Sequence, residues 1–520
     1  MLRSSGALGQ GEAISSEPEQ TSPQGIEAPL AAIAASSGRL GSLTVRQTRV
    51  LTLSKGVSVA SAIARLKQRE GVAWAVPDYV ANMAMPEGSR QGAGASAGVH
   101  EGGPKARAAQ AAEGPQPTKG AEPPPTSGGE RSASPEGNEP GGAQEGGQAG
   151  EKGGEFIPND PGNTNVAGGW RRLQWNFAGP FGVKAPEAWA HLRADGAPGG
   201  RGVVVAVLDT GIAYANGDGF KRSPDFTAGE FVKGYDFVAN DPYPYDRNGH
   251  GTFVAGEIAE ATNNHKDLTG LAYGVKLMPV RVLDASGEGD ASTIAKGVRY
   301  AASHGANVIN LSLEFAGEVT AADVPELTSA LAYAHRRGVV IVAAAGNEDS
   351  TVIPYPARDS RVIAVGATTE HGCLASYSNY GRGVALVAPG GGTDANLPGD
   401  PNCTAPRDSG RDIYQETLKG SSPDVFGMPG GYEGTSMAAP EVSATAALVI
   451  ASGVLGQKPS PAAVRARLTA TATPLGDEAD HLDYGHGLLN AGAATENGGP
   501  GAVAATRSPR KRRARQRAAS

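Results

Sequence analysis

The distribution of apolar positions along this chain predicts a large domain of alternating strands and helices. Continuous apolar runs, typical of parallel strands that are covered by helices on both faces, occur at residues 203–208, 306–313 and 339–345. Helical stretches lie between these runs, at 291–304 and 325–337. We therefore expect residues 155–494 to form a three-layer α/β/α domain with a mainly parallel central sheet.

A second, smaller patterned region covers residues 41–84. Residues 45–53 alternate roughly between apolar and polar positions, as in a strand, and residues 72–76 resemble a second strand. Between them, Ser58 can cap a helix whose apolar positions share one face. Such a unit is small for an independent core, so we expect it to pack against the larger domain.

The remaining segments lack the apolar residues needed for a core. Residues 1–40 are polar and expected to be disordered, and residues 85–154 are a Gly/Pro-rich stretch expected to be a flexible linker. Residues 495–520 are expected to form a disordered tail, which contains Arg510-Lys511-Arg512-Arg513. This basic tail is either a solvated segment or a binding segment for an acidic partner.

The overall composition excludes several classes of protein. Over 520 residues the net charge is −7, so no nucleic-acid partner is expected. The only two cysteines, Cys373 and Cys403, leave room for one disulfide but not for a disulfide scaffold. No apolar run is long enough to span a bilayer, and the first thirty residues lack a clear secretory signal.

Three short motifs carry candidate chemistry. Asp209 ends an apolar run, His250 lies between two glycines, and Ser436 opens a run of small residues that predicts a buried helix. Alone, each is more often a turn residue, a structural histidine or a helix cap. Together they supply the carboxylate, base and hydroxyl of acyl transfer, and Ser436 at a helix amino end would lie beside outward-pointing N–H groups.

These motifs resemble the signatures of the subtilisin family, in the family's order. The matching stretches are Asp209-Thr210-Gly211, His250-Gly251-Thr252, Gly434-Thr435-Ser436-Met437-Ala438, Ala343-Ala344-Ala345-Gly346-Asn347 and Tyr484-Gly485-His486-Gly487-Leu488. The resemblance extends over about two-thirds of the chain and implies a serine endopeptidase that works through an acyl-enzyme. It further implies that Ser436 is the nucleophile, His250 the base, Asp209 the group that orients it, and Asn347 the oxyanion-hole amide.

The resemblance also assigns a role to residues 41–84, which match the family's inhibitory propeptide in their strand–helix–strand order. It implies that this unit packs on the catalytic domain, assists folding and runs its tail through the substrate cleft until it is cut. The protein is then expected to be a zymogen, a monomer, and secreted like its relatives.

For substrates, the resemblance implies a peptide or protein chain that binds as an extra strand. The residues expected to contact it are Ser312, Leu313, Glu314, Ala345 and Gly346. Glu314 stands where the family usually has glycine. We hypothesise that Glu314 favours basic residues near the scissile bond; the alternative is a side chain that points to solvent.

Calcium is the one metal that the resemblance implies. Asp225 matches a family calcium ligand, Asp160 matches its thermitase-like partner, and Asn264 lies in the loop that completes the site. The loop is longer here than in the thermitase-like version.

Other functional classes fit less well. An α/β-hydrolase esterase needs Gly-x-Ser-x-Gly and the order Ser, Asp, His, whereas Ala438 stands two residues after Ser436 and the order is reversed. An acid peptidase of the sedolisin type would have Glu as its base in place of His250. A non-catalytic binding protein on the same fold would not be expected to keep all four catalytic positions.

Overall fold

The computed structural model describes residues 2–4, 50–53, 58–68, 72, 74–86, 156–403, 410–420, 422–476, 481–498 and 500. Its centre is a seven-stranded sheet in which every neighbouring pair is parallel. In spatial order the strands are β12 (Val384–Pro389), β11 (Val362–Thr368), β10 (Val340–Ala344), β8 (Val308–Leu311), β4 (Val204–Asp209), β6 (Lys276–Arg281) and β5 (Tyr235–Asp236).

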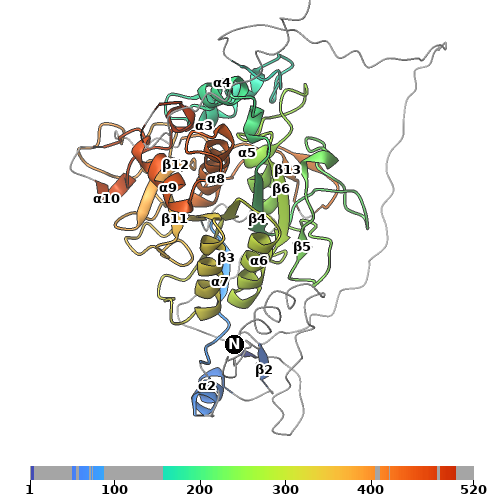
Figure 1. Ribbon diagram of the computed structural model, residues 1–520, viewed down its shortest axis with the longest axis vertical. Coiled ribbons are helices and arrows are strands. Elements are labelled where there is room, and N and C mark those ends of the chain that lie inside the picture. Colours follow the sequence, from blue (N-terminus) through green and yellow to red (C-terminus); the bar gives the residue numbers. More distant parts are fainter. Residues whose placement is uncertain are drawn as a thin grey trace, which may run out of the picture.

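Helices cover both faces of this sheet, which confirms the three-layer α/β/α architecture (Figure 1). One face carries α6 (Ala291–Ser303) and α7 (Pro325–Arg336), and the other carries α5 (His250–Ala259) and α8 (Thr435–Ser452). Around them lie α3 (Trp175–Ala178), α4 (Ala185–Ala194), α9 (Pro461–Ala470), α10 (His481–Tyr484) and α11 (Ala491–Thr495). Within the described residues, no helix is both long and apolar enough to cross a bilayer.

Helix α8 runs through the core, as its run of small residues predicted. Every side chain from Thr435 to Val449 is buried. It contacts strands β4, β8, β10, β11 and β12 as well as α5. Small side chains allow this close packing, and they fix the position of the first turn of α8 relative to the ends of the strands.

The N-terminal residues form a small unit beside the main body. Strand β1 (Leu2–Ser4) pairs with β2 (Leu51–Leu53), and α2 (Val59–Lys67) begins after Ser58, whose side chain accepts the N–H of Ser61 as predicted. Leu53 and Ala62 lie in a core cluster separate from the main one. The predictions for residues 5–49, 87–155 and 501–520 concern residues outside the described ones.

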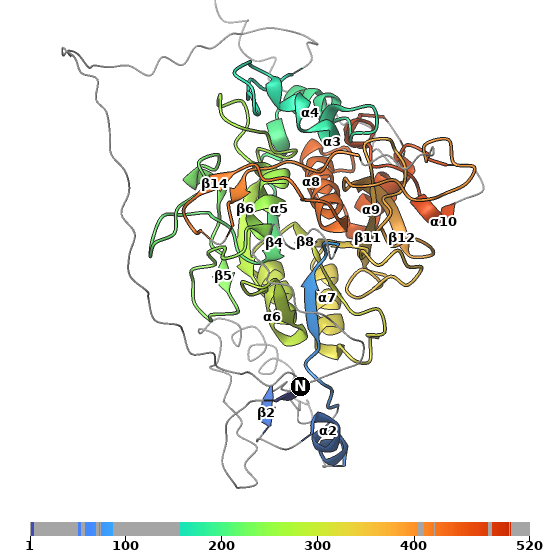
Figure 2. The same ribbon diagram turned by 180° about the vertical axis from the view of Figure 1, so that it is seen from behind.

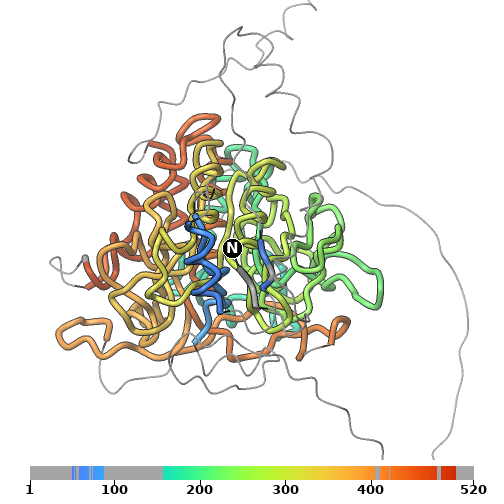
Figure 3. The backbone as a smooth tube through the Cα atoms, turned by 90° about the horizontal axis from the view of Figure 1, so that it is seen from below, coloured from blue at the N-terminus to red at the C-terminus, as the bar shows by residue number. Residues whose placement is uncertain are grey.

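The second strand of this unit is not where the sequence predicted it. The described residues of 72–76 form no strand, and the strand is β3 (Val80–Met83) instead. The reason is tertiary: β3 lies between β7 (Glu288–Asp290) and β9 (Leu313–Phe315) and is antiparallel to both. Figure 2 shows β3 running up along the main body from α2, and Figure 3 shows this segment from below.

The insertion, the long segment between Pro389 and Gly434 that separates β12 from α8, is attached to the main body at several places. A disulfide joins Cys373 to Cys403. Further on, β13 (Thr417–Leu418) and β14 (Phe426–Gly427) form a two-stranded ribbon, and β13 packs against α5.

Candidate active site

Two of the candidate catalytic residues meet where a strand ends and a helix begins. Asp209 is the last residue of β4 and His250 the first of α5. The Nδ1 atom of His250 lies 2.7 Å from Oδ1 of Asp209, and neither side chain is exposed. Gly251 permits this approach, because a Cβ there would collide with the carbonyl oxygen of Gly211.

Asp246 holds the start of α5 in place, and sequence reasoning missed it. Its Oδ1 accepts the N–H groups of Asn248 and Gly249 at 2.9 and 3.0 Å, and its Oδ2 accepts the N–H and hydroxyl of Thr252 at 2.9 and 2.6 Å. An aspartate shortly before an Asn-Gly turn at a helix start was the available signal. We regard Asp246 as a positioning residue for His250.

Ser436 lies in the first turn of α8, as predicted. In this structure its hydroxyl donates to the carbonyl oxygen of Ser312 at 3.2 Å, whereas Nε2 of His250 is buried and has no partner. The two groups are therefore not hydrogen-bonded here. Such bonds often tighten only when the reacting complex forms.

The surroundings of Ser436 offer two donors for a developing oxyanion. The backbone N–H of Ser436 donates to the carbonyl oxygen of Ala84 at 3.2 Å. The Oδ1 atom of Asn347 accepts the N–H of Thr435 at 2.8 Å, which fixes the orientation of the amide. Its Nδ2 atom is buried without a partner, so one donor beside the nucleophile is unused.

A strand of the chain itself occupies the expected substrate position. The N–H of Ala84 donates to the carbonyl oxygen of Ser312 at 3.2 Å, and the N–H of Met83 donates to that of Gly287 at 2.9 Å. Along β9, Leu313 is opposite Met83 and Glu314 is opposite Asn82. These contacts bring the carbonyl group of Ala84 to the candidate nucleophile.

The other two expected substrate-binding residues form a wall beside Ser436. The N–H of Gly346 donates to the hydroxyl of Thr435 at 3.2 Å, and its carbonyl oxygen accepts the N–H of Asn379 at 3.0 Å. The N–H of Ala345 donates to the carbonyl oxygen of Val365 in the main sheet. Gly346 is thus hydrogen-bonded to Thr435, the residue before the candidate nucleophile.

The three candidate calcium ligands lie together around one loop. Asp160 accepts the N–H groups of Asn263 and Asn264 at 2.8 and 2.9 Å, so it holds the loop through its backbone. The amide nitrogen of Asn264 lies 2.5 Å from Oδ1 of Asp225. Within the described residues, no group of three or more His, Cys, Asp or Glu side chains is arranged to hold a metal ion.

The charge around Asp225 nevertheless suits a divalent cation. Burial, together with the neighbouring carboxylates of Glu416, Asp267 and Asp160, raises the pKa of Asp225 to about 8. Burial likewise raises the pKa of Glu416 to about 7. Oxygen ligands from carboxylates and backbone carbonyls are those that calcium prefers, so the chemistry of this region fits calcium.

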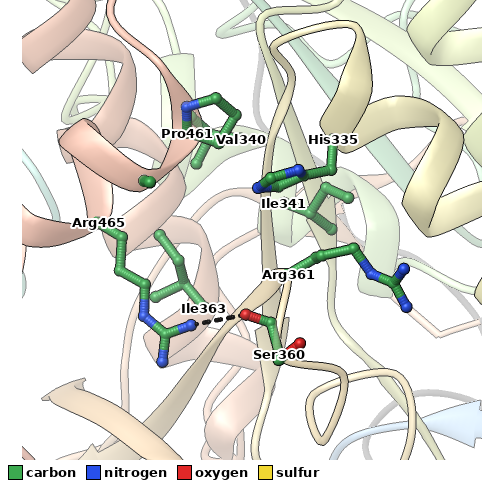
Figure 4. A pocket seen from close by; sticks show the side chains of 9 residues that line it. His335, Val340, Ile341, Ser360, Arg361, Ile363, Pro461 and Arg465 are labelled. Atoms are coloured by element: carbon green, nitrogen blue, oxygen red, sulfur yellow. Dashed lines mark hydrogen bonds between the residues drawn. The ribbon is translucent and has the colours of Figure 1, made fainter.

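A cavity elsewhere in the molecule does not belong to this site. It lies between α7, β10 and α9 (Figure 4), and its lining includes His335, Ser360, Arg361 and Arg465. Arg465 donates to the carbonyl oxygens of Ser360 and Val362, and Arg361 makes two hydrogen bonds to Asp359. The guanidinium groups that line this cavity are therefore already hydrogen-bonded within the protein.

Comparison with known proteins gives consistent matches. The model of the family described as "Subtilase family" matches residues 200–487. The chain is 38% identical over 319 residues to Subtilisin Savinase of Lederbergia lenta, a match that covers 61% of this chain and 98% of that protein. It is 39% identical over 235 residues to Thermitase of Thermoactinomyces vulgaris, covering 45% of this chain and 74% of that protein.

Two further matches differ in coverage. The chain is 39% identical over 275 residues to the Thermophilic serine proteinase of Bacillus sp. (strain AK1), covering 53% of this chain but only 57% of that protein. Among solved structures, proteases from Pseudoalteromonas arctica are similar, with a TM-score of 0.52 and 29% identity. That match covers 65% of this chain and 99% of the solved chain.

Proposed function

This chain belongs to the subtilase family and is a subtilisin-like serine endopeptidase, and we propose that residues 41–84 keep it a zymogen until it cuts itself after Ala84. The observation that carries this proposal is the hydrogen bond from the backbone N–H of Ser436 to the carbonyl oxygen of Ala84. It puts the peptide bond between Ala84 and Met85 at the nucleophile, in a strand bound as a substrate would be.

The proposed chemistry uses four side chains. The hydroxyl oxygen of Ser436 attacks the carbonyl carbon of the scissile bond while Nε2 of His250 takes the hydroxyl proton. Asp209, 2.7 Å from Nδ1, orients the ring and stabilises its charged form. The tetrahedral oxyanion is stabilised by the N–H of Ser436 and by Nδ2 of Asn347.

The remaining steps return the site to its starting state. The C–N bond breaks and the leaving amine takes the proton from His250, which leaves the acyl group on Ser436 as an ester. A water molecule then attacks the ester carbonyl while Nε2 of His250 takes one of its protons. The C–O bond to Ser436 breaks, His250 returns the proton to the Ser436 oxygen, and the carboxylic acid leaves. For this first turnover the amine product is the new N-terminus at Met85, and for later turnovers it is part of a protein substrate.

The decisive experiment compares the full-length protein with Ser436→Ala. The unsubstituted protein should yield a fragment with Met85 as its N-terminus, identified by mass spectrometry, and Ser436 should then react with a fluorophosphonate. Ser436→Ala should remain full length, and Ser303→Ala, an exposed serine on α6, should behave like the unsubstituted protein. Cleavage of Ser436→Ala after Ala84 in pure solution would contradict the proposal.

We also propose one calcium ion beside Asp225 and Asn264, supported by the excess of buried carboxylates there. Calcium would neutralise these carboxylates and fasten the loop at 262–268, without a part in the bond-breaking steps. Added Ca²⁺ should raise the melting temperature of Ser436→Ala, and Asp225→Asn in that background should remove most of the increase. Mg²⁺ serves as the control, and an equal response of both variants to Ca²⁺ would contradict this site.

The disulfide supports an oxidising location for the mature enzyme. Disulfides persist mainly outside the cytosol, and Cys373–Cys403 fixes the insertion to the main body. We therefore propose that the active protease acts on protein substrates outside the cytosol.

A further inference from the structure

We infer that the carboxylate side chain of Glu314 fills the pocket beside the scissile carbonyl, so that the enzyme cuts only after small residues such as alanine, glycine or serine. This inference rests on the proposed function, because it takes Ala84 as a bound substrate residue. Glu314 is then the residue that determines specificity at this position.

The strand register places Glu314 on the same side as the side chain of Ala84. Asn82 is directly opposite Glu314 in the antiparallel pair of β3 and β9, and directly opposite side chains share a face. Ala84 lies one residue beyond the end of β3, but its N–H still donates to the carbonyl oxygen of Ser312, which continues the pairing past Met83 and Leu313. Its side chain therefore shares a face with that of Asn82, two residues earlier. Glu314 is therefore the diagonal neighbour of the Ala84 side chain, within reach of its long side chain.

The carboxylate of Glu314 also reaches the opposite wall of this pocket. A Cβ placed on Gly346 would lie 2.5 Å from Oε2 of Glu314, so the carboxylate rests on the Gly346 backbone. Gly346 directly precedes Asn347, whose side chain borders the nucleophile. The side chain of Glu314 thus extends from the edge strand β9 to the oxyanion-hole segment, across the space next to Ala84.

Neither wall can readily move apart to admit a larger side chain. Gly346 is hydrogen-bonded through its N–H to Thr435 and through its carbonyl oxygen to Asn379. With φ of 102°, it also has a backbone conformation that favours glycine. Glu314 is only 4% exposed and Ala84 is fully buried, so an alanine methyl group already fits in closed surroundings.

A larger residue at this position would meet two penalties. It would have to displace the carboxylate from its packed position, and a large apolar side chain would also place hydrocarbon against a carboxylate that is already buried. Either penalty lowers the rate for large residues relative to alanine. The charge of Glu314 alone predicts a preference for basic residues; its buried position across the pocket favours small ones.

The test uses processed enzyme and internally quenched peptides that contain Ala-Asn-Met-X-Met, the sequence of residues 81–85 with X at the position of Ala84. We expect kcat/KM for X = Ala to exceed those for X = Phe and X = Lys by at least about tenfold, a difference of about 1.4 kcal/mol. Glu314→Gly should raise the value for Phe by about tenfold or more. Glu314→Gln, which keeps the volume and removes the charge, should retain the preference for alanine.

Two outcomes would overturn the inference. One is a preference for Lys that Glu314→Gln abolishes, which would mean that charge decides. The other is an identical ranking of the peptides in Glu314→Gly and the unsubstituted enzyme. Fluorophosphonate labelling of Ser436 distinguishes these results from a failure of the proposed function, because only enzyme that reacts with the label counts as active.

A second measurement uses the chain's own strand. Ala84→Phe in the full-length protein should slow the appearance of the Met85 N-terminus by about tenfold or more, and adding Glu314→Gly should restore much of the rate. Ala84→Gly serves as the matched control, since it introduces no bulk. Equal processing rates for Ala84→Phe and Ala84→Gly would contradict a filled pocket.

Discussion

Asn347 is held so that only one of its two polar atoms remains available. Its Oδ1 accepts the N–H of Thr435, and the adjacent Nδ2 is buried without a partner. A buried donor left without a partner is costly, unless it gains one during the reaction. The amide therefore has the features of a donor that is satisfied only when negative charge develops on the substrate.

We predict that Asn347→Ala lowers kcat by about 10²- to 10³-fold with little change in KM, a size taken from the corresponding donor in other subtilisins. Asn347→Asp is the matched variant, because it keeps the acceptor for the N–H of Thr435 and removes the donor. Its loss should be of similar size. Steady-state kinetics on one peptide would decide, and a change in KM alone would contradict the role.

At the level of single residues, most of the candidate site could be predicted from the sequence. The motifs around Asp209, His250 and Ser436 are local, and each lies at the end of a strand or the start of a helix, where the fold brings such ends together. The role of Asp246 could not be predicted, because it depends on five donors, the hydroxyl of Thr210 among them, that meet only after the turn before α5 has formed. The pairing of Ser436 with Ser312 also depends on contacts that lie far apart in the chain.

Helices α5 and α8, which carry His250 and Ser436, each hold a buried glutamate. Neither Glu257 nor Glu441 is exposed, and Glu441 accepts the amide N–H of Asn176 at 2.7 Å. Burial raises the pKa of Glu257, and the nearby Glu441 raises it further. Burial also raises the pKa of Glu441, so both groups favour the protonated form in the folded protein.

This pair should make the folded protein less stable as the pH rises. Above the ordinary glutamate pKa of 4.5, the unfolded chain loses these protons while the folded protein keeps them, so the free energy of unfolding falls until the raised pKa is reached. Glu257→Gln in the Ser436→Ala background should give a flatter profile and greater stability at pH 8. Urea unfolding at several pH values measures this.

The control for this prediction is Glu187→Gln, an exposed glutamate on α4 that should leave the profile unchanged. A profile for Glu257→Gln that runs parallel to that of Ser436→Ala alone would show that this carboxyl group is not the cause.

Sequence patterns gave the types of the main elements but not every boundary. The single apolar run at 306–313 contributes to two strands: β8 in the parallel sheet, and β9 at the edge of the three-stranded sheet that contains β3. The chain passes from one sheet to the other without a change in hydrophobicity, so the apolar pattern did not predict the break. The strand expected at 72–76 formed at Val80–Met83 instead. Its position depends on two edges more than two hundred residues away, which local propensity does not encode.

For the molecule as a whole, the disulfide is the one covalent link that holds the insertion. Cys373 and Cys403 are 30 residues apart in the sequence, and closing a loop of that length reduces the entropy of the unfolded chain. Replacing both cysteines with serine in the Ser436→Ala background should lower the free energy of unfolding by about 3 kcal/mol. Urea unfolding measures the change.

Reductant provides the control for the disulfide. It should destabilise Ser436→Ala by a similar amount and leave the double serine variant unaffected. Equal sensitivity of both proteins to reductant would mean that the stability does not come from this bond.

The path of the insertion could not be predicted from the sequence, since its contacts are tertiary. Its strand β13 packs on α5, and the hydroxyl of Thr417 donates to the carbonyl oxygen of Gly249, next to His250. The sequence placed the insertion before the nucleophile, whereas the structure brings it against the helix that carries the base.

The position of β3 between β7 and β9 limits which proteins this enzyme can cleave. If β3 leaves as proposed, the cleft accepts only a chain that is itself extended over at least four residues and free on both edges. Helices and strands inside a native sheet cannot meet that condition without first opening. The rate at which a folded protein is cleaved should therefore follow the equilibrium population of its locally opened states. Proteins of low local stability should be cleaved faster than stable ones.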